Sequence, residues 1–240
     1  MSGHSKWAQI KRKKALTDAK KGRLFSKLSK IIEVAAKNGG TDYKTNFSLK
    51  AAVEQARAVN MPAANIEKAI EKGGGDGEGP SSLEEVLYEA YGPGGVAILI
   101  IGVTDNKNRT VSEIKHILSQ FGGRLAESGS VKWLFKEKGV VRVSRGDESS
   151  LARVEELAIL NNAEDVQVGH VDFEIIVSLA GFEKLKKVFQ EVGFDTKDSS
   201  VEWLAKNLAT LGQEDNEKLE AILEALEENE DVSEVFTNSG

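Results

Sequence analysis

The chain has 240 residues, of which 40% are hydrophobic and 29% are charged, with no cysteine and a formal net charge of −6. The length predicts two or three domains, and the lack of cysteine excludes disulfides and thiolate chemistry and fits a reducing compartment, with the cytoplasm as the default. The longest apolar run, residues 96–101, is too short to span a membrane, and no hydrophobic segment follows the basic N-terminus as in a secretory signal.

Charge is divided unevenly along the chain. Residues 1–72 hold 16 basic and 6 acidic side chains, a net of +10. Residues 73–240 hold 16 basic and 32 acidic side chains, a net of −16. This asymmetry predicts a basic module that binds a polyanion, followed by an acidic body that does not.

The first part of the chain is predicted to be helical. Part of residues 5–21 is expected to form a helix, and apolar positions at a spacing of 3.6 residues then predict a clear helix from Arg23 to the Asn-Gly-Gly stop at residues 38–40. A second helix is predicted over residues 47–60, and a third begins at Pro62 and ends before Gly73. Short amphipathic helices are not stable alone, so the three are expected to pack as a bundle.

Residues 73–82, with the sequence GGGDGEGPSS, have the composition of a linker. They predict a domain boundary at which the orientation of the two sides is adjustable.

An α+β pattern follows the linker. The predicted elements are, in order, strand 85–91, a Gly-Pro-Gly-Gly turn, strand 96–103, a polar loop over 104–109, a helix ended by Gly122-Gly123, and strand 131–135. The next set is strand 140–143, helix 148–160, strands 163–168 and 173–178, helix 182–192 and strand 200–204. Its β-α-β-β-α-β order is that of the ferredoxin-like fold.

A helix over residues 216–227 and a strand over 232–236 complete the chain, and they supply the elements that the first α+β segment lacks. The sequence therefore predicts a multidomain α+β protein with a three-helix N-terminal bundle and two α+β domains, one inserted in the other. The predicted domains are 1–79 with the linker, a discontinuous domain of 80–136 and 207–240, and an inserted ferredoxin-like domain of 137–206.

Catalytic patterns are absent from the sequence. His4, His116 and His170 lie in three different predicted modules without metal-ligand spacing, and neither a P-loop nor a nucleophile elbow occurs. Acidic pairs such as Glu84-Glu85 are typical of solvated surfaces. We therefore expect no enzyme activity, no catalytic residue, no metal or cofactor, and no small-molecule substrate.

The basic residues near the N-terminus are the candidate nucleic-acid-binding side chains, because phosphate binding requires converging guanidinium and ammonium groups. The candidates are Lys6, Trp7, Lys11, Arg12, Lys13, Lys14, Lys20, Lys21, Arg23, Lys27 and Lys30. Trp7 has two interpretations: stacking on a base, or packing the arm onto the bundle, which we favour.

A second candidate patch consists of Asn106, Lys107 and Arg109, where a predicted helix begins and backbone N–H groups favour anions. The alternative is helix capping by Asp105 or Asn106, which is at least as well supported.

Several segments, in order, resemble a known family: GHSKWAQIKRKK, DAKKG, FSKL, AAKNGG, NMPAANIEKAI, YEAYGPGGVAILI, TDNKNRTVSEI and GSVKW. The chain is similar over essentially its whole length to the YebC/PmpR family of transcriptional regulators, which includes the mitochondrial translational activator of cytochrome oxidase. The resemblance implies three domains and a cytoplasmic, non-enzymatic regulator that binds DNA, or that acts on translating ribosomes and relieves stalling.

We therefore expect a transcriptional regulator that binds DNA through its basic helical domain. The first alternative is a ribosome-associated translation factor that binds RNA through the same domain. The second is a protein-interaction scaffold built on the ferredoxin-like sheet, for which the basic arm is dispensable.

Overall fold

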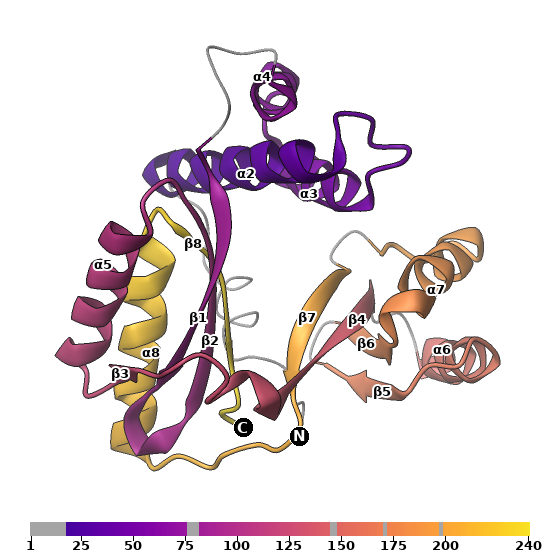
Figure 1. The fold of residues 1–240 in the computed structure, drawn as a ribbon. Coiled ribbons are helices and arrows are strands. Elements are labelled where there is room, and N and C mark those ends of the chain that lie inside the picture. The colour runs from indigo at the N-terminus through magenta and orange to yellow at the C-terminus, as the bar shows by residue number, and fades with distance from the viewer. Residues whose placement is uncertain (1–17, 76–81, 145–147, 170–171, 197–198) are drawn as a thin grey trace. The chain divides into compact units, whose positions relative to one another are not determined.

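The computed structural model describes residues 18–75, 82–144, 148–169, 172–196 and 199–240 (Figure 1). The chain forms two compact units, of which one is built from Leu134–Leu208 and the other from the segments on either side of it. Each contains one four-stranded sheet. The predicted α+β fold class, with a helical bundle and one α+β domain inserted in another, is confirmed.

Three helices form the N-terminal bundle: α2 (Asp18–Gly39), α3 (Phe47–Ala58) and α4 (Ala63–Gly74). Their apolar faces share one core, in which burial of each large aliphatic side chain contributes about 1.5–3 kcal/mol. The core consists of Leu28, Ile32, Ala35, Ala36, Leu49, Ala52, Val53, Ala56, Met61, Ile66 and Ala69.

The third helix is longer than predicted. It was expected to end before Gly73, but α4 continues through Gly74, and Gly75 caps it with a left-handed φ of 87°. Gly73 is buried against α2, where a Cβ atom would lie 2.3 Å from the backbone oxygen of Glu33. The first glycine of the predicted linker thus permits close helix packing, and residues 76–81 lie outside the described ranges.

The first sheet has the strand order β3-β1-β2-β8. Strands β1 (Glu84–Tyr91) and β2 (Ala97–Thr104) form an antiparallel pair, and β8 (Val232–Thr237) lies beside β2. The short β3 (Arg124–Leu125) pairs with β1. Because the last strand of the chain completes a sheet that begins at Glu84, the domain is discontinuous.

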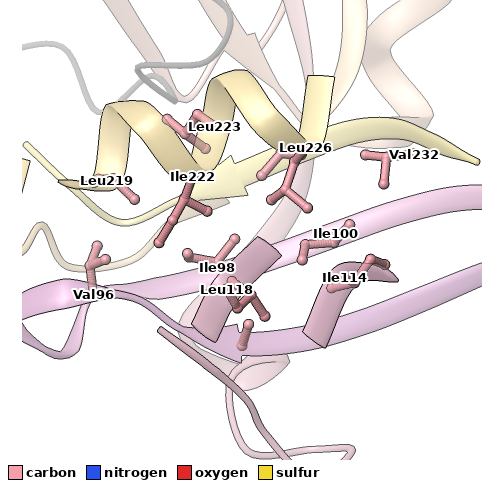
Figure 2. Packing of buried hydrophobic residues seen from close by; sticks show 12 residues of the cluster. Val96, Ile98, Ile100, Ile114, Leu118, Leu219, Ile222, Leu223, Leu226 and Val232 are labelled. Atoms are coloured by element: carbon pink, nitrogen blue, oxygen red, sulfur yellow. The ribbon is translucent and has the colours of Figure 1, made fainter. Parts of the chain in front are cut away.

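Helices α5 (Lys107–Gln120) and α8 (Gln213–Glu228) cover one face of this sheet. Figure 2 shows Leu219, Ile222 and Leu226 of α8 facing the strand residues Ile98 and Ile100, with Ile114 and Leu118 of α5 beside them. The predicted turn between β1 and β2 is η1 (Pro93–Gly95), in which Gly94 and Gly95 have positive φ.

The bundle and the first sheet are joined by direct contacts, which differs from the adjustable boundary predicted at the linker. Val34 of α2 packs with Leu83 and Val103. Lys37 Nζ also donates a hydrogen bond to the backbone oxygen of Leu83, at 3.0 Å. The helices and this sheet belong to the same compact unit.

The strand predicted over residues 131–135 is wrong. The chain forms a short 3-10 turn, η2 (Lys132–Leu134), and the next strand begins at Phe135. The backbone N–H groups of Val131 and Lys132 donate to the carboxylate of Glu89, so they are not available to a strand ladder.

The inserted unit has the ferredoxin-like order. Its elements are β4 (Phe135–Ser144), α6 (Glu148–Leu160), β5 (Asp165–Val168), β6 (Asp172–Val177), α7 (Leu179–Glu191) and β7 (Ser200–Ala205). The antiparallel sheet has the order β5-β6-β4-β7, which is the split βαβ arrangement. Strand β4 starts five residues before the predicted residue 140 because its first half pairs with β7 and its second half with β6.

The two faces of this sheet differ in chemistry. Helices α6 and α7 pack on one face over an apolar core that includes Val141, Phe173 and Ile175. On the other face, the buried Arg142 guanidinium bonds the Glu174 carboxylate at 2.8 Å and the Glu202 carboxylate at 2.6 Å.

In the described parts of the chain, no helix is long and apolar enough to cross a membrane.

Candidate nucleic-acid interface

Three of the candidate cations lie on one face of α2 and contact an acidic segment at the end of α8. The Nζ atom of Lys27 donates to the backbone oxygen of Glu227 at 2.5 Å, and an Nη atom of Arg23 lies 3.8 Å from the Glu228 carboxylate. Lys30 Nζ donates to the Asp231 carboxylate at 2.8 Å and to the backbone oxygen of Glu230 at 3.2 Å. These side chains attach α2 to the α8–β8 turn.

The end of α8 is a favourable place for cations. The last carbonyl groups of a helix lack intrahelical donors and carry partial negative charge. Helix α8 has no basic residue in its last turn, so its own sequence does not neutralise this end. Lys27 of α2 supplies the missing positive charge and one hydrogen bond.

Asp231 brings the two predicted patches together. One carboxylate oxygen accepts from Lys30, while the other accepts from Arg109 Nη2 at 2.7 Å, Thr110 Oγ1 at 2.8 Å and Thr104 Oγ1 at 3.2 Å. Burial raises the pKa of Asp231, but hydrogen bonds from Lys30, Arg109 and Thr110 outweigh it and lower the pKa to about 2. Asp231 is therefore charged at neutral pH and shared between α2 and α5.

The side chains of the second patch all bond within the chain. Asn106 caps α5 by accepting the backbone N–H of Arg109 at 3.1 Å, which is the capping interpretation considered above. Lys107 pairs with Glu84 at 2.9 Å, and Arg109 bonds both Asp105 and Asp231.

The remaining candidates divide between described and undescribed parts of the chain. Lys21 is described and exposed on the first turns of α2. The side chains of Lys6, Trp7, Lys11, Arg12, Lys13, Lys14 and Lys20 lie outside the described ranges.

Sequence reasoning missed the acidic partners of the α2 cations. The acidic run at residues 227–231 was visible as EENED, but Lys27 and its acceptor lie 200 positions apart. Only the positions 23, 27 and 30, which share a helix face, indicated that these cations act together.

Among the described residues, no group of three histidine, aspartate or glutamate side chains is arranged to hold a metal ion.

Comparison with known proteins extends over nearly the whole chain. Residues 5–76 match the family model described as the TACO1/YebC protein N-terminal domain, and residues 83–239 match the model of the TACO1/YebC second and third domain. A crystal structure of a conserved hypothetical protein, Aq1575 from Aquifex aeolicus, is 41% identical and superposes with a TM-score of 0.87, covering 98% of this chain and 97% of that one.

Curated relatives carry a functional name. A probable transcriptional regulatory protein of Caldanaerobacter subterraneus is 45% identical over 238 residues, covering 99% of this chain and 98% of the relative. One from Thermoanaerobacter pseudethanolicus is 47% identical over 241 residues, covering 99% and 96%. With both family models matched in order and full-length relatives at this identity, the chain belongs to the TACO1/YebC family.

Proposed function

We propose that this chain is a regulatory protein that binds nucleic acid, acting as a transcriptional regulator on DNA through the cations that precede Arg23. The observation that carries the proposal is how the basic charge is used. Arg23, Lys27 and Lys30 contact acceptors within the chain. Residues 1–21 hold seven basic side chains and one acid, Asp18, so the sequence of this segment carries a formal charge of +6.

An excess of this kind suits a phosphate backbone. Each phosphate that a lysine or arginine neutralises releases condensed counterions, and this release supplies most of the sequence-independent affinity. The names of the curated relatives, probable transcriptional regulatory proteins, support a regulatory role for the binding.

A second candidate is a translation factor that binds ribosomal RNA through the same cations. Exposed aromatic side chains favour it, because aromatic stacking is the usual way in which proteins recognise unpaired bases. Phe47 is 69% exposed and Trp133 is 63% exposed.

Replacing Lys11, Arg12, Lys13 and Lys14 by alanine tests the proposal. The variant is expected to bind a DNA duplex at least tenfold more weakly than the wild type at low salt, without a change in thermal stability, because four phosphate contacts are lost. The matched control removes four exposed cations elsewhere: Lys115, Arg153, Lys184 and Lys187.

Affinity is measured in parallel for the DNA duplex and for single-stranded fragments of ribosomal RNA. The proposal expects the control variant to bind like the wild type. The proposal is contradicted if both variants lose affinity equally, or if the variant at Lys11, Arg12, Lys13 and Lys14 loses none. Preference for RNA over the duplex selects the translation-factor candidate.

A further inference from the structure

The loop segment between β3 and β4, which includes η2, presents one large aromatic side chain to solvent. Trp133 is 63% exposed, although tryptophan is among the residues with most to gain from burial. Its Nε1 atom donates to the backbone oxygen of Ser130 at 2.9 Å. Because the only polar atom of the ring is bonded within the loop, the exposed indole offers a flat π surface to a ligand.

A buried carboxylate fixes this loop. Glu89 on β1 is 3% exposed and accepts three backbone N–H groups: Gly129 at 2.6 Å, Val131 at 2.5 Å and Lys132 at 2.7 Å. Burial raises the pKa of Glu89, but these three hydrogen bonds outweigh it and hold the pKa below its ordinary value. The backbone that carries Trp133 is thus held in one conformation, which reduces the entropy cost of binding.

A second aromatic ring and two cations flank this segment: Tyr91 at the end of β1, Arg124 on β3 and Lys132 in η2. Tyr91 OH donates at 3.1 Å to the backbone oxygen of Ser130. The same oxygen accepts the hydrogen bond from Trp133 Nε1. The Arg124 guanidinium lies 5.4 Å from the centre of the Tyr91 ring, in a cation–π arrangement. Arg124 and Lys132 are both exposed.

We propose that Tyr91, Arg124, Lys132 and Trp133, here called the aromatic–cationic surface, bind single-stranded nucleic acid. One unpaired base stacks on the Trp133 ring, and Lys132 and Arg124 contact the flanking phosphates. This inference rests on the second candidate of the proposed function, a protein that binds RNA, and it names the class of ligand for this surface: strands with unpaired bases.

The chemistry of the surface favours this occupant over a duplex or an apolar protein. A duplex hides the faces of its bases, whereas an unpaired base leaves its π face free for an aromatic side chain. An apolar partner would place apolar groups against the exposed Arg124 and Lys132 side chains, whereas phosphates place opposite charge there.

Intrinsic fluorescence tests the stacking directly. The chain has three tryptophans, so replacing Trp7 and Trp203 by phenylalanine leaves Trp133 as the sole reporter in the full-length protein. Titration with oligouridylate RNA and oligothymidylate DNA is expected to quench this fluorescence, whereas an abasic strand of the same length is expected not to. Equal quenching by the abasic strand, or no quenching by any strand, overturns the proposal.

Substitutions at Trp133 in the otherwise wild-type chain separate stacking from simple apolar contact. Trp133→Ala and Trp133→Leu are expected to lower affinity for the RNA strand about tenfold, while Trp133→Phe retains most of it, because stacking needs an aromatic ring. The logarithmic salt dependence is expected to stay unchanged, since no charge is removed. Ile159→Ala, at a residue that is 75% exposed in the other unit, is the control and is expected to bind like the wild type.

The two proposals fail in distinguishable ways. If the Lys11, Arg12, Lys13 and Lys14 variant loses affinity while Trp133→Ala and Trp133→Leu do not, the stacking site is wrong and the nucleic-acid function stands. If Trp133→Leu binds as Trp133→Phe does, the contact is apolar and the proposal is overturned. If Trp133→Ala loses affinity for oligouridylate RNA but not for oligothymidylate DNA, the strand that the site binds is RNA. If it loses affinity for both equally, the site also binds single-stranded DNA.

Discussion

Asp231 is the residue at which the N-terminal bundle and the first α+β domain depend on each other. Its carboxylate is 3% exposed and binds Lys30 of α2, Arg109 and Thr110 of α5, and Thr104 at the end of β2. A buried carboxylate with two cationic partners is stabilising only while all of these bonds are formed. The sequence indicated Lys30 and Arg109 as phosphate ligands, and it contained no local sign of their shared acceptor.

Replacing Asp231 by asparagine is expected to remove a defined pH dependence. The carboxyl has a pKa of 3.8 when unfolded and about 2 in the native state, so its charge stabilises the fold fully above about pH 4. This contribution, about 2 kcal/mol, is lost as the pH falls from 4 through 2. Urea unfolding of both proteins between pH 6 and pH 2 measures it.

The wild type is expected to lose more stability than Asp231→Asn over that range, and the two curves are expected to converge near pH 2. Parallel curves would show that Asp231 is not held in its charged form by Lys30 and Arg109. The threonine hydroxyls remain as donors in the variant, so a complete loss of folding is not expected.

Among the helices and strands, those with a local signal were predictable. The amphipathic period of α3 and the β-branched run of β2 are properties of neighbouring residues, and both elements lie where the sequence placed them. Strand β4 was predicted only in part, because Lys136, Glu137 and Lys138 at its start are charged, and Lys138 is buried through its bond to Glu164. That compensation comes from a residue 26 positions away.

Two glycines in the helical bundle are expected to respond oppositely to alanine. Gly73→Ala is expected to destabilise the protein by about 1–3 kcal/mol, since the new Cβ would lie 2.3 Å from the oxygen of Glu33. Gly22 lies within α2 with no atom within 4 Å of such a Cβ, so Gly22→Ala is expected to stabilise by about 0.5–1 kcal/mol. Thermal unfolding of both variants measures the pair, and a shift in the same direction would contradict the close packing of α4 on α2.

For the whole molecule, the division of charge was the most informative property of the sequence. It indicated a basic helical part and an acidic remainder, and the structure shows part of that basic charge engaged with acidic residues of the α8–β8 turn. The order of strands in the inserted sheet also followed from the sequence, because β-α-β-β-α-β has one common antiparallel arrangement. The pairing of β8 with β2 depended on recognising that two incomplete segments supply each other's missing elements.

The loop that carries Trp133 was not predictable in the same way. Its conformation depends on Glu89, which is 40 positions from Gly129, and an acidic residue in a strand gives no sign that it will bind backbone amides. The exposure of Trp133 likewise required the structure, because tryptophan in an apolar segment usually indicates a core residue.

The most direct test of the central claim, that excess N-terminal cations neutralise phosphates, is the salt dependence of binding by the full chain. We expect the logarithm of the association constant to fall with the logarithm of salt concentration with a slope of roughly −3 to −6, corresponding to about four to seven phosphates. Alanine at Lys11, Arg12, Lys13 and Lys14 is expected to make the slope shallower by about 3. A wild-type slope near zero, or an unchanged slope in the variant, would contradict the account.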